Sequence, residues 1–351
     1  MSAALHRPLM KRLFEARELG GQSLTAKCAT YTALIFWTLV VLVPLYWVLV
    51  TSLKIRIVVD SGPFYVPFLD FLPSLENWRY IFFDLGRDTL RPYMNSVVVA
   101  FSSTVIAVLI GSLASYALVR LTFRVKIAAV VTFLSLLAAT IVAVAVLGVA
   151  WQLAAGVAAA LFILFLATLA RRFTRALGNS DIEFWIISNR IMPPVVAVLP
   201  IYLMFQQLHL LDTQIALIAT YTAVNLPIVV WLTRDFFAAI PIELDESAEI
   251  DGASKFRIFF TIALPLVRPG LVATFLLVLI LAWNEYLLAL FLSNANAQTM
   301  PILVSAQNGT RGPEWGYMSV LIVIMIAPVV AMTVALQKQI ARGLLVGALK
   351  G

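Results

Sequence analysis

The most charged stretch in the second half of the chain is ELDESAEIDGASKFRIFFTIALPLVRPG, residues 243–270. Its first nine residues carry five carboxylates, in a chain that is 62% hydrophobic and 12% charged. No catalytic cluster accompanies them in the sequence, so we expect no enzymatic use. Acidic side chains at this density suit contact with a partner protein. The alternative is a helix that lies against lipid headgroups, although an anionic inner leaflet repels the acidic half of such a helix.

The other reactive residue types are too sparse for metal, redox or nucleotide chemistry. One cysteine, Cys28, cannot form an internal disulfide, and the isolated His6 and His209 make no recognisable metal site. The sequence contains no GxxxxGK[ST] stretch to hold nucleotide phosphates. We therefore expect no catalytic residue, no metal and no cofactor bound by this chain. The net charge of +7 is interpreted as membrane topology, with nucleic-acid binding as a distant alternative.

The local sequence predicts that the acidic stretch forms a helix, a turn and a second helix at the membrane face. Pro241 suits the first turn of a helix, and the carboxylates after it lie where the helix dipole favours negative charge. Gly252 then interrupts the apolar spacing of Leu244 and Ala248. A second amphipathic piece begins at Phe256 and leads to a proline.

The elements that position this stretch are predicted to be membrane helices. Mean hydropathy is +0.96, and uncharged runs of 26, 28 and 23 residues follow Lys27, Arg91 and Glu314. Each run can cross about 30 Å of hydrocarbon at about 1.5 Å per residue. These runs lack the alternation of apolar and polar residues that marks a membrane β-barrel. The predicted class is an all-α polytopic membrane protein.

A fourth uncharged run, residues 127–170, has 44 residues, about twice the length that one span needs. We expect it to form two helices with a tight turn near residues 148–156. The chain is then predicted to have eight transmembrane helices, near residues 28–53, 93–119, within 127–170 (two), 184–208, 213–234, 270–292 and 316–337.

Lysine and arginine are distributed as expected for an even number of spans with both termini in the cytoplasm. This topology places 18 of the 25 basic residues inside and six outside, with Arg190 within a span. Residues 1–27 and 339–351 are then cytoplasmic, and 54–92 form the external loop. The prolines and aromatic residues of this loop favour an ordered cap, with a passive connector as the alternative.

The stretch ESAEIDGASKFRIFFTIALPLVRPG closely resembles the EAA loop of binding-protein-dependent ABC import permeases. Ser247 replaces the usual alanine, and the residues that match the signature are Glu246, Ala248, Asp251, Gly252, Ile262, Leu264 and Pro265. The resemblance implies a type I ABC importer transmembrane fold over residues 93–338. It also implies that residues 236–268 form a cytoplasmic coupling loop. The residues implied in coupling to an ATPase are Glu246, Ala248, Asp251, Gly252, Leu264 and Pro265.

Six further stretches resemble the carbohydrate-uptake branch of these permeases: PYMNSVVVA, ASYALVRLTF, IMPPVVAVLPIYL, NLPIVVWLTRDFF, WNEYLLAL and the tail ARGLLVGALKG. The resemblance covers about residues 1–126 and 180–351 and leaves out the middle. Permeases of this kind commonly have six spans, so the hairpin at 127–170 is interpreted as an insertion of two. We expect it to pack on the bundle or to face lipid, with contact to another subunit or a small membrane protein as the alternative.

The resemblance also implies partners and a location. The partners are a second permease subunit in a heterodimer, two ATPase subunits that bind ATP and magnesium, and an extracytoplasmic solute-binding protein. The location is the cytoplasmic or inner membrane of a bacterium or archaeon, and lipid is the surrounding medium. The implied function is to form half of the translocation pathway for a sugar or a related polyol or glycerol-type solute. A secondary transporter and a non-transporting membrane scaffold are the alternatives.

Prolines and polar residues interrupt several apolar spans. Such groups are tolerated in a membrane mainly where they face protein or water, so they are candidates for the solute pathway. The candidates are Asn225, Trp283, Asn284 and Glu285, with Gln206 and Gln207 nearer the outer mouth. Helix kinking and interhelical hydrogen bonding are the alternative for each. Arg190 is predicted to be structural, because its side chain can reach the cytoplasmic headgroups.

Overall fold

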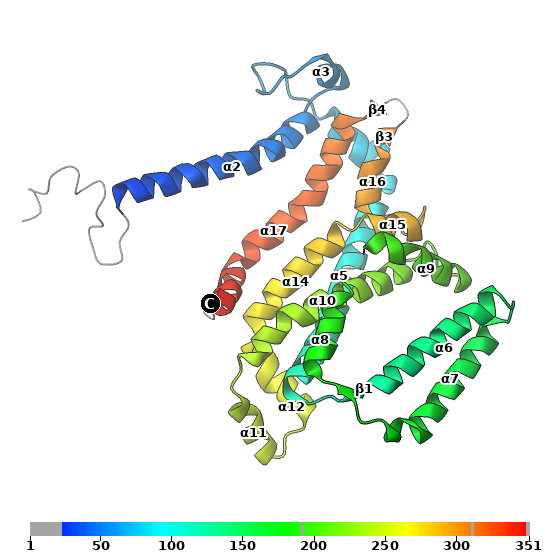
Figure 1. Cartoon of the computed structure of the whole chain (residues 1–351). Coiled ribbons are helices and arrows are strands. Elements are labelled where there is room, and N and C mark those ends of the chain that lie inside the picture. Colours follow the sequence, from blue (N-terminus) through cyan, green and yellow to red (C-terminus); the bar gives the residue numbers. More distant parts are fainter. Residues whose placement is uncertain (1–22, 191–192, 310–311, 349–351) are drawn as a thin grey trace, which may run out of the picture. The chain divides into compact units, whose positions relative to one another are not determined.

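The computed structural model describes residues 23–190, 193–309 and 312–348 (Figure 1). The described residues are mainly helical, which confirms the predicted all-α class. They divide into two compact units, one containing residues 1–91 and 303–328 and the other 92–302 and 329–351. Two long helices belong to both units, α5 (Gly86–Arg120) and α17 (Trp315–Ala348).

The first unit is built on helix α2 (Leu24–Ser52), which begins where the Ser23 side chain accepts a hydrogen bond from the backbone of Ala26. The remaining elements of this unit are short. They are α3 (Arg56–Ser61), α4 (Glu76–Arg79), the π-helical turn η1 (Tyr80–Asp84) and the antiparallel strands β3 (Asn308–Gly309) and β4 (Gly312–Pro313).

Buried Asn77 of α4 holds the end of α2 and the residues that follow it through hydrogen bonds. The Asn77 side-chain amide donates hydrogen bonds to the backbone carbonyls of Ser52 and Lys54, at 3.3 and 2.7 Å. Gly316 faces the same amide so closely that an added Cβ would lie 2.7 Å from Asn77 Nδ2. Two backbone N–H groups donate to the Asp70 carboxylate, and these bonds hold the pKa of Asp70 below its usual value. These contacts give the loop a defined conformation.

The second unit contains the remaining elements. In chain order they are β1 (Val125–Lys126), α6 (Ile127–Ala145), α7 (Trp151–Thr168), η2 (Ala170–Arg172), β2 (Ala176–Leu177), α8 (Asn179–Ser188), α9 (Pro194–Gln207), α10 (Gln214–Ala238), α11 (Ile242–Ile250), α12 (Lys255–Ile258), η3 (Phe259–Ala263), α13 (Leu264–Leu266), α14 (Arg268–Trp283), α15 (Leu287–Leu292) and α16 (Met300–Ala306). The last of these, α16, ends in the first unit.

Helix α10 packs closely against α5 and α14 because glycines remove the side chains that would separate them. An added Cβ at Gly111 of α5 would lie 2.5 Å from Val229, and one at Gly270 of α14 would lie 2.5 Å from the Phe236 ring. Neither neighbour is the flexible end of a long side chain, so both glycines are needed for this packing. A buried hydroxyl pair, Ser115 with Thr233 at 2.9 Å, adds a hydrogen bond between α5 and α10.

Helices α6 and α7 lie side by side as a hairpin, which confirms the prediction of two helices within residues 127–170 (Figure 1). The turn between them includes Gly148 with φ +66°, inside the predicted turn. None of the described side chains in either helix is buried. Strands β1 and β2 pair antiparallel at the base of the hairpin and join its two ends.

The prediction of a single span near residues 184–208 is wrong. The structure instead has α8, which ends at Ser188, and α9, which begins at Pro194. Pro193 and Pro194 explain the interruption, because a proline restricts the residue before it and has no N–H to continue a helix. Helix α8 is held instead by an ion pair between its Glu183 and Arg234 of α10, at 2.8 Å.

Among the described residues, six helices are long and apolar enough to cross a membrane, or seven if one bent pair counts as a span. The six are α2, α5, α6, α7, α10 and the described apolar part of α17. The bent pair joins residues 255–266 to α14 at 82°. The predicted count of eight is therefore not confirmed. The interruption predicted at Trp283, Asn284 and Glu285 is present, since α14 ends there and α15 begins after it.

Candidate functional site

The acidic stretch folds as predicted, as a helix, a turn and a second helix. Pro241 directly precedes α11, and Gly252 lies in the turn with φ +80°, a conformation that residues with a side chain rarely adopt. The Ser254 side chain accepts from the backbone of Arg257 and caps α12. We call residues 241–267 the coupling segment. It connects the end of α10 to the start of α14.

The inner face of the coupling segment packs on an aromatic cluster. The buried members are Tyr116, Phe237, Ile240, Ile258, Phe259, Ala263 and Val267. The Tyr116 ring lies 5.7 Å from the Phe237 ring and 5.3 Å from the Phe259 ring, so one residue of α5 contacts both the end of α10 and η3 of the segment. Three signature residues pack against this cluster: Ala248, Ile262 and Leu264. They therefore have a structural role in holding the segment on the bundle.

A buried ion pair fixes α11 to the end of α5. Arg120 Nε contacts the Asp245 carboxylate, and the exposed fractions of the two side chains are 8% and 4%. The same guanidinium donates to the backbone carbonyl of Ile240 at 2.8 Å. Removing one partner from such a pair leaves an unpaired buried charge and costs about 3–5 kcal/mol. Arg120 and Asp245 thus form a buried ionic link between the coupling segment and the bundle.

Neither Arg120 nor Asp245 was predicted from the sequence as a functional residue. Asp245 looked like one of five similar carboxylates, whereas only Asp245 is buried. A weak signal was available, because Asp245 and Ala248 are three residues apart and so share one face of α11. No comparable signal named its partner, because Arg120 resembles any basic residue at the end of a span.

The outer face of the coupling segment carries the other signature residues. Glu246, Asp251 and Gly252 are exposed, and neither carboxylate forms a hydrogen bond or ion pair within the described residues. Two large apolar side chains lie beside them, Ile250 at 87% exposed and Phe256 at 69%. An exposed face with free carboxylates and apolar side chains has the composition of a protein-binding surface.

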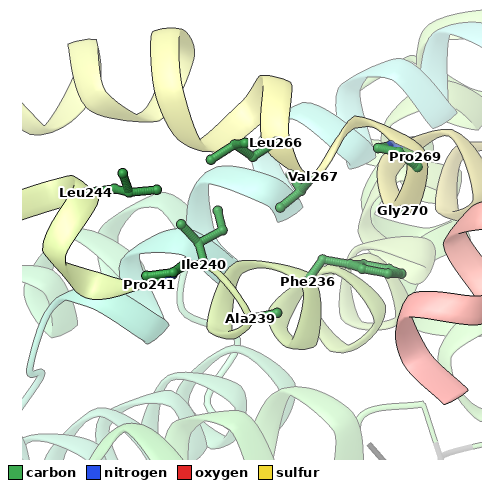
Figure 2. A pocket seen from close by; sticks show the side chains of 9 residues that line it. All are labelled: Phe236, Ala239, Ile240, Pro241, Leu244, Leu266, Val267, Pro269 and Gly270. Atoms are coloured by element: carbon green, nitrogen blue, oxygen red, sulfur yellow. The ribbon is translucent and has the colours of Figure 1, made fainter. Parts of the chain in front are cut away.

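Apolar grooves flank the root of the coupling segment. One has a volume of about 260 Å³. In it the end of α10 and the start of α11 face α13 and the start of α14 (Figure 2). Its lining includes Pro241, Leu244, Leu266 and Phe236. A second groove, of about 450 Å³, is lined partly by the signature residues Leu264 and Pro265. Both grooves lie where the segment joins the membrane helices.

The candidate pathway residues fall into two groups. Tyr221 of α10 links two of them, because its backbone carbonyl accepts from Asn225 Nδ2 at 2.9 Å and its hydroxyl donates to the Glu285 carbonyl at 3.2 Å. Buried Trp283 packs edge-on against Tyr93 of α5, with ring centroids 6.1 Å apart. The structure therefore brings Asn225, Trp283 and Glu285 to the packed region shared by α10, α14 and the start of α15.

The other candidates do not join this group. The Asn284 side chain is exposed and donates to the Ile280 carbonyl within its own helix, at 2.8 Å. Gln206 and Gln207 are exposed on α9. The Glu285 carboxylate accepts from the backbone of Leu288 at 3.0 Å and so caps α15, which is a structural task. Arg190 donates to the Val224 carbonyl at 3.3 Å, as a structural residue does.

Asp212 is a further polar residue that the sequence analysis missed. It precedes α10 and accepts hydrogen bonds from the backbone N–H groups of Asn294, Asn296 and Ala297, at 2.8–3.0 Å. Burial alone raises the pKa of Asp212, but these bonds outweigh it and lower the pKa below its usual value. This loop lies at the opposite end of the 25-residue α10 from the coupling segment, about 37 Å away along the helix.

Comparison with known proteins decides what kind of protein carries this segment. Residues 165–346 match the family described as "Binding-protein-dependent transport system inner membrane component". The chain belongs to this family. It is therefore a multi-pass membrane component of a transport system and not an enzyme. The match begins within α7, after most of the hairpin.

Individual relatives match over most of their length. The trehalose transport permease SugB of Mycobacterium tuberculosis is 30% identical over 333 residues, 93% of this chain and 99% of the relative. The trehalose/maltose permease MalG of Thermococcus litoralis is 28% identical, covering 90% and 94%. The sulfoquinovosyl glycerol permease SmoH of Agrobacterium fabrum is also 28% identical, covering 88% and 89%.

A solved structure shares the fold. A chain of a bacterial ABC transporter involved in the import of the acidic polysaccharide alginate superposes with a TM-score of 0.59. The comparison covers 95% of this chain and 98% of that chain, at 18% identity. The fold is therefore that of a type I ABC importer membrane subunit, as the sequence resemblance implied.

Proposed function

We propose that this chain is the permease subunit of an ATP-driven importer and forms half of a pathway for a sugar or a related polyol or glycerol-type solute. The complete transporter then contains a second permease subunit, two ATPase subunits and an external solute-binding protein. The ATPase subunits bind ATP and magnesium and carry out the hydrolysis. Family membership supports the transport role, and the names of SugB, MalG and SmoH support the class of solute.

The single observation that carries the coupling role is the two-sided construction of the coupling segment. The buried Arg120–Asp245 pair and the aromatic cluster fasten its inner face to α5 and α10. Glu246, Asp251 and Ile250 remain available on its outer face. An ATPase subunit that binds the outer face can therefore move the membrane helices through the inner face. Gly252 supplies the turn that sets the angle between α11 and α12.

The pathway assignment rests on Asn225, Trp283 and Glu285. Aromatic faces and amide groups suit a polyhydroxylated solute, because sugars present apolar ring faces and many hydroxyl groups. A secondary transporter would also need a carboxylate within the membrane to couple transport to an ion, and Glu285 is a candidate for that role. Its carboxylate caps α15 and its carbonyl binds Tyr221, so a structural role accounts for it without ion coupling.

The function is tested by purifying the tagged full chain from its native membrane and identifying the proteins that accompany it. We expect an ATPase subunit and a second permease. ATPase activity of the reconstituted complex should rise when the binding protein is added with its sugar, and the sugar should accumulate in the vesicles. Absence of an ATPase partner, or transport driven by an ion gradient without ATP, would contradict the proposal.

Orientation is tested separately. We propose that both termini and the coupling segment lie in the cytoplasm, because 18 of 25 basic residues are then inside. Reporter fusions after Arg175 and after Lys350 should both give a cytoplasmic signal. An external signal at either position contradicts this topology.

A further inference from the structure

The base of the α6–α7 hairpin carries an unusual concentration of positive charge. From residue 121 to residue 180 the chain contains five basic residues and no acidic one. The five are Arg124, Lys126, Arg171, Arg172 and Arg175. Pairing of β1 with β2 brings both ends of the hairpin together, so all five belong to one region. In the described part of the chain, no carboxylate pairs with any of them.

Lys126 is already used for structure. Its ammonium group donates to the Ala170 carbonyl at 2.7 Å, at the end of the hairpin, and the Ile127 backbone donates to the Arg175 carbonyl at 3.1 Å. The arginine side chains are exposed and have no such partner among the described residues. The base is therefore a fixed frame that presents free guanidinium groups.

A groove of about 490 Å³ lies between this frame and the two helices. Its apolar side is formed by Ile127, Ala128, Val131 and Phe165 of α6 and α7. Its polar side is formed by Arg172, Thr174 and Arg175, and Phe173 also lines it. The helices of 19 and 18 residues are each about one membrane thickness long, so this groove lies at the boundary between hydrocarbon and headgroups.

We propose that this groove is a binding site for one anionic phospholipid. The phosphate and the rest of the anionic headgroup contact Arg172 and Arg175, with Thr174 as a hydroxyl donor. The upper part of an acyl chain lies along Ile127, Val131 and Phe165. The proposal rests on charge complementarity, because a basic pocket next to apolar helix surface matches a molecule with an anionic head and an apolar tail.

The division of the groove distinguishes this ligand from others with part of the same chemistry. Free phosphate can bind the arginine side chains, but it leaves the apolar side of the groove exposed to water. A zwitterionic phospholipid fills the apolar side, but its headgroup brings a cation toward two guanidinium groups. The proposal is independent of the transport function, since it uses only residues of the hairpin and its base.

The test measures lipid selectivity of the purified full chain in phosphatidylcholine vesicles. Spin-labelled phosphatidylglycerol and spin-labelled phosphatidylcholine report the fraction of lipid held at the protein. We expect selective retention of phosphatidylglycerol. Retention should weaken about fivefold in Arg172→Gln or Arg175→Gln and about thirtyfold in the double variant, from the usual contribution of one basic residue near an anionic headgroup.

Arg171→Gln is the matched control. Arg171 is also exposed and lies in the same segment, but it does not line the groove. This variant loses the same charge and should keep most of the selectivity. An equal loss in all three single variants would overturn the site and show diffuse attraction of lipid to a basic surface. Phosphate that displaces the labelled lipid better than chloride of equal ionic strength would overturn it as well, since the headgroup anion alone would then be the ligand.

Discussion

The α6–α7 hairpin and the coupling segment are both helix–turn–helix elements, yet they are fastened to the protein in opposite ways. None of the described side chains in α6 and α7 is buried, and the hairpin is held at its base by the β1–β2 pair and a few backbone contacts. The coupling segment is short and charged, and its inner face holds a buried ion pair and an aromatic cluster. We therefore expect that the hairpin can be removed without loss of the bundle, whereas the coupling segment packs against its core.

The difference follows from the solvent that each element meets. Lipid satisfies an apolar helix on every side, so α6 and α7 need no partner to be stable in a membrane. A charged segment in water gains little from surface contacts, so it needs buried contacts to stay in place. Exposure of apolar surface therefore has a different meaning in the two regions. In the hairpin it indicates lipid, and at Ile250 and Phe256 it indicates a protein partner.

The largest effect is expected from Asp245→Asn. This change leaves the Arg120 charge buried without its partner, which costs about 3–5 kcal/mol, so α11 should detach from α5. ATPase stimulation by the loaded binding protein should be lost, and protease should cleave near α11 faster. Glu243→Gln is the control for stability, because this exposed carboxylate on the same helix should change it by less than about 0.5 kcal/mol. Equal protease resistance in the two variants would show that the ion pair does not hold α11.

Gly252→Pro should have the next largest effect. Proline cannot adopt the φ of +80° found here, and it also removes the Gly252 N–H that donates to the Glu249 carbonyl at 2.9 Å. ATPase stimulation should fall while the amount of protein in the membrane stays near normal. Gly252→Asn is the matched variant, because asparagine tolerates positive φ and an added Cβ meets no atom within 4 Å. If Gly252→Asn impairs ATPase stimulation as much as Gly252→Pro does, then the positive φ of Gly252 is not the reason that coupling needs a glycine here.

Glu246→Lys should act on the outer face alone. The side chain is exposed and unpaired within the described residues, so stability should change by less than about 0.5 kcal/mol. Reversal of its charge should nevertheless reduce ATPase stimulation, with or without loss of ATPase binding in a pull-down. Wild-type transport by this variant would favour the alternative in which α11 only lies against headgroups.

The smallest effect is expected from deleting residues 127–170. The deletion joins Lys126 to Arg171, and residues 171–175 can then connect β1 to β2 as a short loop without changing their pairing. Assembly and sugar transport should remain near normal, whereas selective retention of phosphatidylglycerol should be lost. Failure of the complex to assemble would show that the hairpin is a structural part of the bundle and would remove the contrast with the coupling segment.

Much of the fold could be predicted because membrane helices depend on local composition. An uncharged run such as 127–170 must form spans whatever its neighbours are, and its length requires two. The error at 184–208 has the opposite cause. Hydropathy favoured one span, but consecutive prolines at 193 and 194 separate α8 from α9, and the Glu183–Arg234 ion pair then fixes α8.

The sequence by itself determined the membrane class, the hairpin, the position of the coupling turn at Gly252 and the resemblance to importer permeases. Each of these depends on residues that are close together in the chain. Only the tertiary structure decided that Asp245 is the buried carboxylate among five and that Arg120 is its partner. It likewise decided that Tyr221 connects Asn225 with Glu285. The reason is physical: a charge can be buried only beside its partner, and that partner is fixed by where separate helices end against one another.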